Sequence, residues 1–240
     1  MAATAQVPVA VVLGVGPGLG AALARRFAQG YAVALNARSP EYIQTLAKEI
    51  QDAGGRALAI PADVGERSQV EAAFATIRER LGPPAVLLYN AGSGTWGTIT
   101  DITPEQYESA WRVNAYGAFL SAKAVAPDMI ARGHGVMFFT GATAGVKAGP
   151  KSVAFGPAKF ALRGLAQSLA RDLGPKGIHV AWINVDGVIN IPGRRAQFSH
   201  LAEDDLLKPE AIAETYWHLV HQDRSAWTQE LDLRPFKEKF

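Results

Sequence analysis

The chain of 240 residues contains no cysteine. Disulfide bonds and thiolate metal sites are therefore excluded, together with small disulfide-rich secreted scaffolds. Hydrophobic residues make up 48% of the sequence, which is enough to form the core of one α/β domain spanning residues 1–240. From these features we expect an intracellular, cytoplasmic protein.

The sequence also has little excess of either positive or negative charge. The formal net charge is +2, and lysine and arginine are scattered along the chain, which argues against nucleic-acid or membrane-surface partners. The first charged side chain is Arg25, so the apolar start lacks the positive residues that precede the apolar run of a signal peptide. Glycines between positions 14 and 20 interrupt that run, which argues against a membrane span. We expect a small molecule to be the partner.

Two common kinds of active site are missing too. His218 and His221 lie three positions apart on a predicted helix, but no third metal ligand accompanies them, so no metal is expected. The sequence contains no Gly-x-Ser-x-Gly motif of the kind that marks a hydrolase nucleophile.

Short apolar runs, rich in valine and bounded by glycine or polar residues, alternate with longer helical segments. The runs predict strands at 7–13, 31–37, 56–64, 85–92, 135–141, 179–186 and 228–233. The segments between them predict helices at 18–30, 40–55, 68–82, 103–133 (one helix or two abutting ones), 153–173 and 209–221. Such alternation predicts a doubly wound α/β fold, with a parallel sheet covered on both faces. Ligands of these sheets bind at the carboxyl ends of the strands.

A glycine-rich loop, GVGPGLG, follows the first predicted strand and opens the first helix. The dinucleotide pattern G-x-G-x-x-G fails because position 19 is Leu19, whereas G-x-x-x-G-x-G fits Gly14, Gly18 and Gly20. Glycines allow the backbone to approach a pyrophosphate at a helix N-terminus. The alternative is a tight turn that binds nothing.

The second predicted strand ends at Ala37, where NAD-binding proteins often have an acidic residue for the ribose hydroxyls. Ala37 cannot fill that role. Arg38 follows it and is either a ligand for the 2′-phosphate of NADP(H) or a solvated surface arginine. NADP(H) is accordingly favoured over NAD(H).

Five motifs occur in order: GVGPGLG (14–20), ADV (62–64), YNAG (89–92), VNAYG (113–117) and FGPAK (155–159). Together they resemble the short-chain dehydrogenase/reductase family over almost the whole chain. The resemblance implies a Rossmann-type sheet in the order 3-2-1-4-5-6-7, a substrate lid at 187–207, and dimers or tetramers built on the helices around 103–131 and 152–173.

The resemblance also implies roles for individual residues. Asn114 and Lys159 correspond to catalytic positions, and Lys159 would also bind the nicotinamide ribose. The positions implied in cofactor binding are Gly14, Gly18, Leu19, Gly20, Arg38, Asp63, Val64, Asn90, Ala91, Gly92, Lys159, Gly187 and Ile189.

The sequence departs from the family at the proton-donating residues. Phe155 occupies the position of the catalytic tyrosine, and Ala142 occupies that of the serine. Asp186-Gly187 stands where the family has Pro-Gly. Two functions follow as hypotheses: an oxidoreductase with an altered proton pathway, or a nucleotide-binding pseudoenzyme that acts as a sensor or scaffold.

Overall fold

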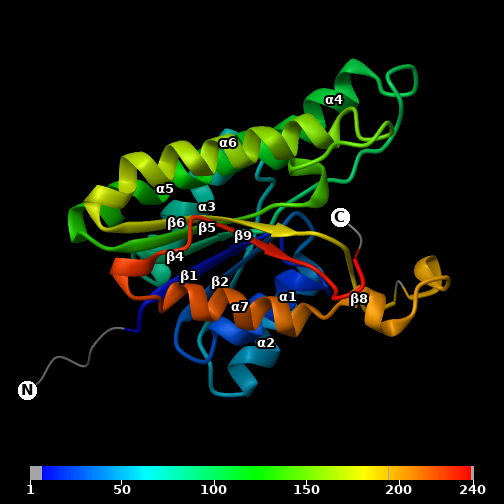
Figure 1. The fold of residues 1–240 in the computed structure, drawn as a ribbon. Coiled ribbons are helices and arrows are strands. Elements are labelled where there is room, and N and C mark those ends of the chain that lie inside the picture. The colour runs from blue at the N-terminus through cyan, green and yellow to red at the C-terminus, as the bar shows by residue number, and fades with distance from the viewer. Residues whose placement is uncertain (1–6, 194, 239–240) are drawn as a thin grey trace, which may run out of the picture.

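The fold is built on one seven-stranded parallel sheet (Figure 1), seen in a computed structural model that describes residues 7–193 and 195–238. The strand order is β3-β2-β1-β4-β5-β6-β9, and every pairing is parallel. The strands of this sheet are β1 (Val9–Leu13), β2 (Ala32–Ala37), β3 (Ala57–Pro61), β4 (Pro84–Tyr89), β5 (Gly135–Thr140), β6 (Ile178–Val185) and β9 (Glu230–Leu233). The predicted order is thereby confirmed, with β9 as the seventh strand.

Helices cover both faces of the sheet. In Figure 1, α5 and α6 lie above it, and α1, α2 and α7 lie below it. The helices are α1 (Leu19–Phe27), α2 (Pro40–Asp52), α3 (Arg67–Arg80), α4 (Pro104–Trp111), α5 (Gly117–Arg132), α6 (Phe155–Leu173) and α7 (Pro209–Val220). Strand β1 shows why two layers form: Val9, Val11 and Leu13 join the core that includes α3, α5 and α6, whereas Ala10 and Val12 join the core that includes α1, α2 and α7. Because side chains alternate along a strand, a run that is apolar throughout needs cover on both sides.

The predicted helical segment 103–133 consists of α4, a π-helical turn (Arg112–Tyr116) and α5, in unbroken succession. The Gly117 N–H donates to the Arg112 carbonyl five residues earlier, which is the π-helical spacing. A capping box at Thr103, with Gln106 bonding back to it, starts α4.

Residues 187–207 contain two short strands, β7 (Val188–Ile189) and β8 (Leu206–Leu207), which pair with each other outside the main sheet. The role of this segment as a substrate lid stays a prediction. In the described part of the chain, no helix combines the length and the apolar character that crossing a membrane requires.

Candidate active site

A cleft of about 420 Å³ opens at the carboxyl ends of β1, β2, β3 and β4. It lies at the switch point of the sheet, where the chain order reverses between β1 and β4. Seven of the residues predicted to bind a cofactor line this cleft: Gly14, Arg38, Asp63, Val64, Asn90, Ala91 and Gly92. Four separate loops therefore converge at the place where this class of sheet binds nucleotides.

The glycine loop requires its glycines. Gly14 has a φ of +84°, and a Cβ there would lie 2.4 Å from the Ala91 Cα. A Cβ on Gly20 would lie 2.5 Å from the Gly14 carbonyl oxygen, so neither position accepts a side chain. Asn90 secures the loop, because its Nδ2 donates to the Gly14 carbonyl at 2.9 Å. The backbone of residues 14–20 can thus approach a ligand closely.

The segment after β6 also packs on the glycine loop. A Cβ on Gly18 would lie 2.9 Å from Cγ1 of Ile191. Gly187 and Ile189 belong to this segment and do not line the cleft described above, nor do Gly18, Leu19 and Gly20.

The end of β2 is secured by a buried asparagine. The Asn36 Nδ2 donates to the backbone carbonyls of Ile60 and Ala62, at 3.0 Å each. The backbone carbonyl of Asn36 accepts from the backbone N–H groups of Gly14 and Val15. Ala37 and Arg38 follow at the cleft wall, with Arg38 exposed. No carboxylate therefore occupies the position after β2, and a guanidinium borders the cleft instead.

Asn114 is fully buried in the π-helical turn. Its Nδ2 donates to the Ala110 carbonyl at 2.9 Å and to the Ser93 carbonyl at 3.1 Å, which ties α4 to the loop after β4. Its Oδ1 has no hydrogen-bond partner among the described residues. A buried acceptor of this kind is costly to leave unpaired, so the site is suited to an additional donor such as water or a ligand.

Lys159 is 5% exposed, and its Nζ donates to the Thr140 carbonyl at 2.9 Å. Burial lowers the pKa of Lys159 to about 8, because a charged ammonium is disfavoured away from water. A Cβ on Gly92 would lie 3.2 Å from the Asn114 Oδ1 and 3.6 Å from the Lys159 Nζ. Asn114 and Lys159 therefore lie next to Gly92, which lines the cleft, although neither of them lines it itself.

Phe155 is the first residue of α6, one helical turn before Lys159. Its ring centroid lies 5.6 Å from the Lys159 Nζ and 5.0 Å from the centroid of Trp96, at an interplanar angle of 48°. Ala142 follows β5 in extended backbone and is partly exposed. Neither side chain carries a proton donor, so this arrangement lacks the two hydroxyls that the family resemblance implies at these positions.

A polar network instead lies at the ends of β5, β6 and β9. Asp186 is 5% exposed and accepts a hydrogen bond of 2.6 Å from the Thr143 hydroxyl. The Arg234 Nη2 lies 3.6 Å from the Asp186 Oδ2 and 2.9 Å from the Asp232 Oδ2. The Asn184 amide donates to Asp232 at 2.7 Å. The acidic residue at the place of the family's proline is thus part of a bonded unit that reaches the residue next to Ala142.

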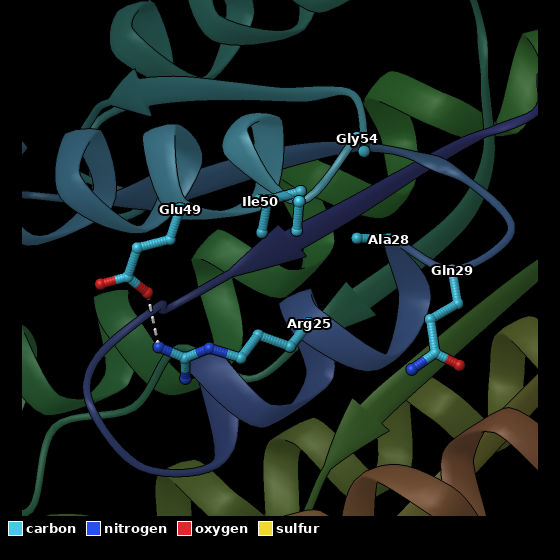
Figure 2. A pocket seen from close by; sticks show the side chains of 8 residues that line it. Arg25, Ala28, Gln29, Glu49, Ile50 and Gly54 are labelled. Atoms are coloured by element: carbon cyan, nitrogen blue, oxygen red, sulfur yellow. Dashed lines mark hydrogen bonds and ion pairs between the residues drawn. The ribbon is translucent and has the colours of Figure 1, made fainter.

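A second hollow, shown in Figure 2, lies between the carboxyl ends of α1 and α2, where residues predicted for catalysis or cofactor binding are absent. Arg25 and Glu49 face each other across it at 2.9 Å, and both side chains are more than half exposed. An exposed ion pair of this kind contributes about 0–1 kcal/mol to stability and does not indicate a catalytic or binding site. Among the described residues no cluster of three metal-ligating side chains occurs either.

Four residues that take part in these contacts were not predicted from the sequence as site residues. Trp96 lies in a loop with no motif, and it meets Phe155 only in the folded chain. Asn36 directly precedes Ala37, the position at which an acidic residue was expected, and no motif marks Asn36 itself. Thr143 and Arg234 become partners of Asp186 because β5, β6 and β9 are neighbours in the sheet. Of this polar network, the sequence indicated only Asp186, as an acidic residue where the family resemblance implies proline.

The fold and the position of the cleft define a Rossmann-type α/β protein. The family model described as short chain dehydrogenase matches residues 8–197. The short-chain dehydrogenase/reductase eriH from Hericium erinaceus is 33% identical over 176 residues, covering 71% of this chain and 70% of the relative. The chain therefore belongs to the short-chain dehydrogenase family, a family of oxidoreductases.

Solved structures agree with this assignment. The crystal structure of a short-chain dehydrogenase from Rhodopseudomonas palustris is 34% identical, with a TM-score of 0.84, and the match covers 96% of this chain and 100% of that one. A metagenomic short-chain oxidoreductase, solved in complex with NADP, is 27% identical with a TM-score of 0.84, covering 98% of this chain and 100% of that one.

Proposed function

We propose that this protein is an NADP(H)-dependent oxidoreductase that acts on a small apolar substrate with an altered proton pathway. The observation that carries the proposal is that Asn114 and Lys159 lie next to Gly92, which lines a cleft bordered by the glycine loop and Arg38. The cofactor would rest on residues 14–20, with Asp63 and Val64 beside the adenine and Lys159 at the nicotinamide ribose. When bound, NADPH supplies a hydride to an electrophilic carbon.

The two missing hydroxyls limit what this site does with ordinary ketones. A positioned general acid contributes roughly 10²- to 10⁴-fold to rate, and Phe155 and Ala142 contribute no proton. Holding a substrate against the nicotinamide still accelerates transfer through proximity. We therefore expect weak or absent reduction of simple ketones by the parent protein.

The alternative is a nucleotide-binding pseudoenzyme serving as a sensor or scaffold, which the same two replacements favour. The two functions differ in turnover and agree in cofactor binding. A panel of carbonyl and imine compounds with NADPH separates them, because a pseudoenzyme binds the cofactor and transfers hydride to none of the compounds.

Cofactor binding itself is testable by thermal shift. NADPH at about 100 times its Kd should stabilise the fold by about 2.7 kcal/mol. Arg38→Ala should weaken NADPH binding tenfold or more and leave NADH binding nearly unchanged, because only NADPH carries the 2′-phosphate that a guanidinium would contact. Arg25→Ala, whose exposed arginine pairs with Glu49 at the other edge of the sheet, is the matched control. The absence of stabilisation by either cofactor would refute the proposed function.

We further propose that the protein is a homo-oligomer, a dimer or tetramer, in which a second copy covers the outer face of α4, α5 and α6. Large apolar side chains are exposed on these helices: Trp111 is 43% exposed, Phe119 44% and Phe160 43%. Trp111, Tyr116 and Phe119 stack in a row with centroid separations of 5.4 and 6.3 Å. Aromatic rows of this kind are enriched at protein interfaces.

Light scattering at micromolar concentration should therefore return a multiple of 25.5 kDa, the mass of one chain. Phe119→Glu should shift the mass toward the monomer, because it buries a charge in an apolar contact. Ile99→Glu, at an exposed loop residue outside these helices, should not. A parent mass of one chain is the result that contradicts the proposal.

A further inference from the structure

Reduction of a ketone and reduction of an iminium ion place different demands on a site. Hydride addition to a ketone leaves an alkoxide, which needs a proton. Hydride addition to an iminium carbon neutralises a positive charge already present and leaves a neutral amine. A site without a proton-donating hydroxyl is therefore matched to the second reaction and poorly matched to the first.

The polar groups around positions 142 and 155 are already engaged. The Thr143 hydroxyl donates to Asp186 at 2.6 Å, so its proton is directed at a carboxylate rather than at a substrate. The Thr140 hydroxyl is bonded to the buried Tyr216 hydroxyl at 2.8 Å. The Lys159 ammonium donates to the Thr140 carbonyl at 2.9 Å. The two threonine hydroxyls near Phe155 and Ala142 are thus already bonded within the protein.

What the site has gained is negative charge. Asp186 is nearly fully buried at the carboxyl end of β6, and its guanidinium partner Arg234 is shared with Asp232. Two carboxylates around one guanidinium carry a formal net charge of −1. A buried carboxylate is costly unless cations compensate it, and the distance of 3.6 Å from Asp186 to Arg234 is the longer of the two ion pairs.

The surroundings of Lys159 add two aromatic faces. Phe155 and Trp96 stand 5.0 Å apart at a tilt of 48°, and Trp96 is 61% exposed. Aromatic faces attract cations, and the Phe155 ring already has the Lys159 ammonium within 5.6 Å. The same faces accept a flat apolar ring system. Because Lys159 repels a second cation, such a ligand depends on the rings and on Asp186 for its binding.

We propose that the substrate is a planar apolar iminium ion, with Asp186 as its counter-charge and the faces of Phe155 and Trp96 as its binding surface; the proposal rests on the proposed NADP(H)-dependent function. In the balanced step, the hydride of NADPH forms a C–H bond at the iminium carbon, and the C=N π electrons become the nitrogen lone pair. NADPH is oxidised to NADP⁺, the iminium is reduced to a tertiary amine, and no proton is transferred.

The test compares two probes of the same bicyclic shape, N-methyl dihydroisoquinolinium, a permanent cation, and tetralone, a neutral ketone, each with NADPH and the full chain. We expect turnover of the cation. Asp186→Asn should lower kcat/KM for the cation tenfold or more, equal to about 1.4 kcal/mol of transition-state stabilisation, while the Kd of NADPH changes less than threefold. Asp172→Asn, which removes an exposed carboxylate paired with Lys176 near the C-terminal end of α6, should change kcat/KM less than twofold.

A second measurement uses the parent protein alone and does not depend on the folding of a variant. The quaternary ammonium N,N-dimethyl tetrahydroisoquinolinium should bind the NADPH complex at least tenfold more tightly than uncharged tetralin. Equal binding of the two, or no turnover of the cation by a protein that binds NADPH, overturns the iminium proposal and leaves cofactor binding intact. Failure to bind NADPH at all is a separate result and counts against the proposed function.

Discussion

The double variant Phe155→Tyr/Ala142→Ser should reduce simple activated ketones with NADPH at least tenfold faster than the parent. Tyrosine matches phenylalanine in shape, and the Phe155 ring already stands one turn from Lys159, with the ammonium 5.6 Å from its centroid. The added hydroxyls would supply a proton donor and a hydrogen bond to the developing alkoxide. A tenfold gain is a modest part of the roughly 10²- to 10⁴-fold that general acid catalysis provides.

The single variants provide the control for this gain. Phe155→Tyr and Ala142→Ser should each do less than the pair, because both groups would act on one developing charge. The parent should be nearly inert toward the same ketones. Unchanged turnover in a double variant that folds and binds NADPH would contradict the idea that only the hydroxyls are missing, and would indicate that Asp186 has altered the placement of the nicotinamide. Strong activity of the parent would mean that another residue supplies the proton.

The substitution Lys159→Met should have two effects of opposite sign. It should weaken NADPH binding tenfold or more, since it removes a charged donor predicted to contact the ribose. It should also stabilise the protein without cofactor, because a buried ammonium disappears. The difference between an ordinary lysine pKa of 10.5 and about 8 in the folded protein corresponds to about 3 kcal/mol. Loss of the hydrogen bond to Thr140 offsets about 1 kcal/mol of this, so we expect a net gain of about 2 kcal/mol at pH 7.

The pH dependence identifies the cause of that gain. Because the pKa of Lys159 is lowered on folding, the unfolded chain binds more protons between pH 8 and 10.5, and the parent's free energy of unfolding gains a positive slope there. Below about pH 8 the penalty is complete. Denaturant unfolding at a series of pH values should therefore show the variant's advantage shrinking as the pH rises through this window.

Lys48→Met provides the matched control for this experiment, because Lys48 is an exposed lysine paired with Asp52 on α2. Its free energy of unfolding should change by about 0.5 kcal/mol or less, without a slope in the same pH window. An advantage of Lys159→Met that does not vary with pH would show that packing, rather than removal of charge, is responsible.

Periodicity alone was sufficient to predict the layers and the parallel sheet. Runs such as 9–13 are apolar at every position, which is typical of a strand covered on both faces, and predicted helical segments of ten or more residues separate them. The order of the strands came from the family resemblance, since periodicity does not specify neighbours. The glycine loop was recognisable for a similar local reason: a strand, a tight turn and a helix N-terminus follow one another within a few residues.

The chemistry of the site could be predicted only in part from the sequence. The sequence by itself showed Phe155 and Ala142, and the family resemblance led to the prediction that two catalytic hydroxyls are missing there. The tertiary structure decided what surrounds those positions. Asp186 and Thr143 are 43 residues apart, and their bond exists because β5 and β6 are adjacent in the sheet. Trp96 reaches Phe155, and Arg234 reaches Asp186, for the same reason: the ends of parallel strands bring together side chains whose separation along the chain carries no information about their distance in space.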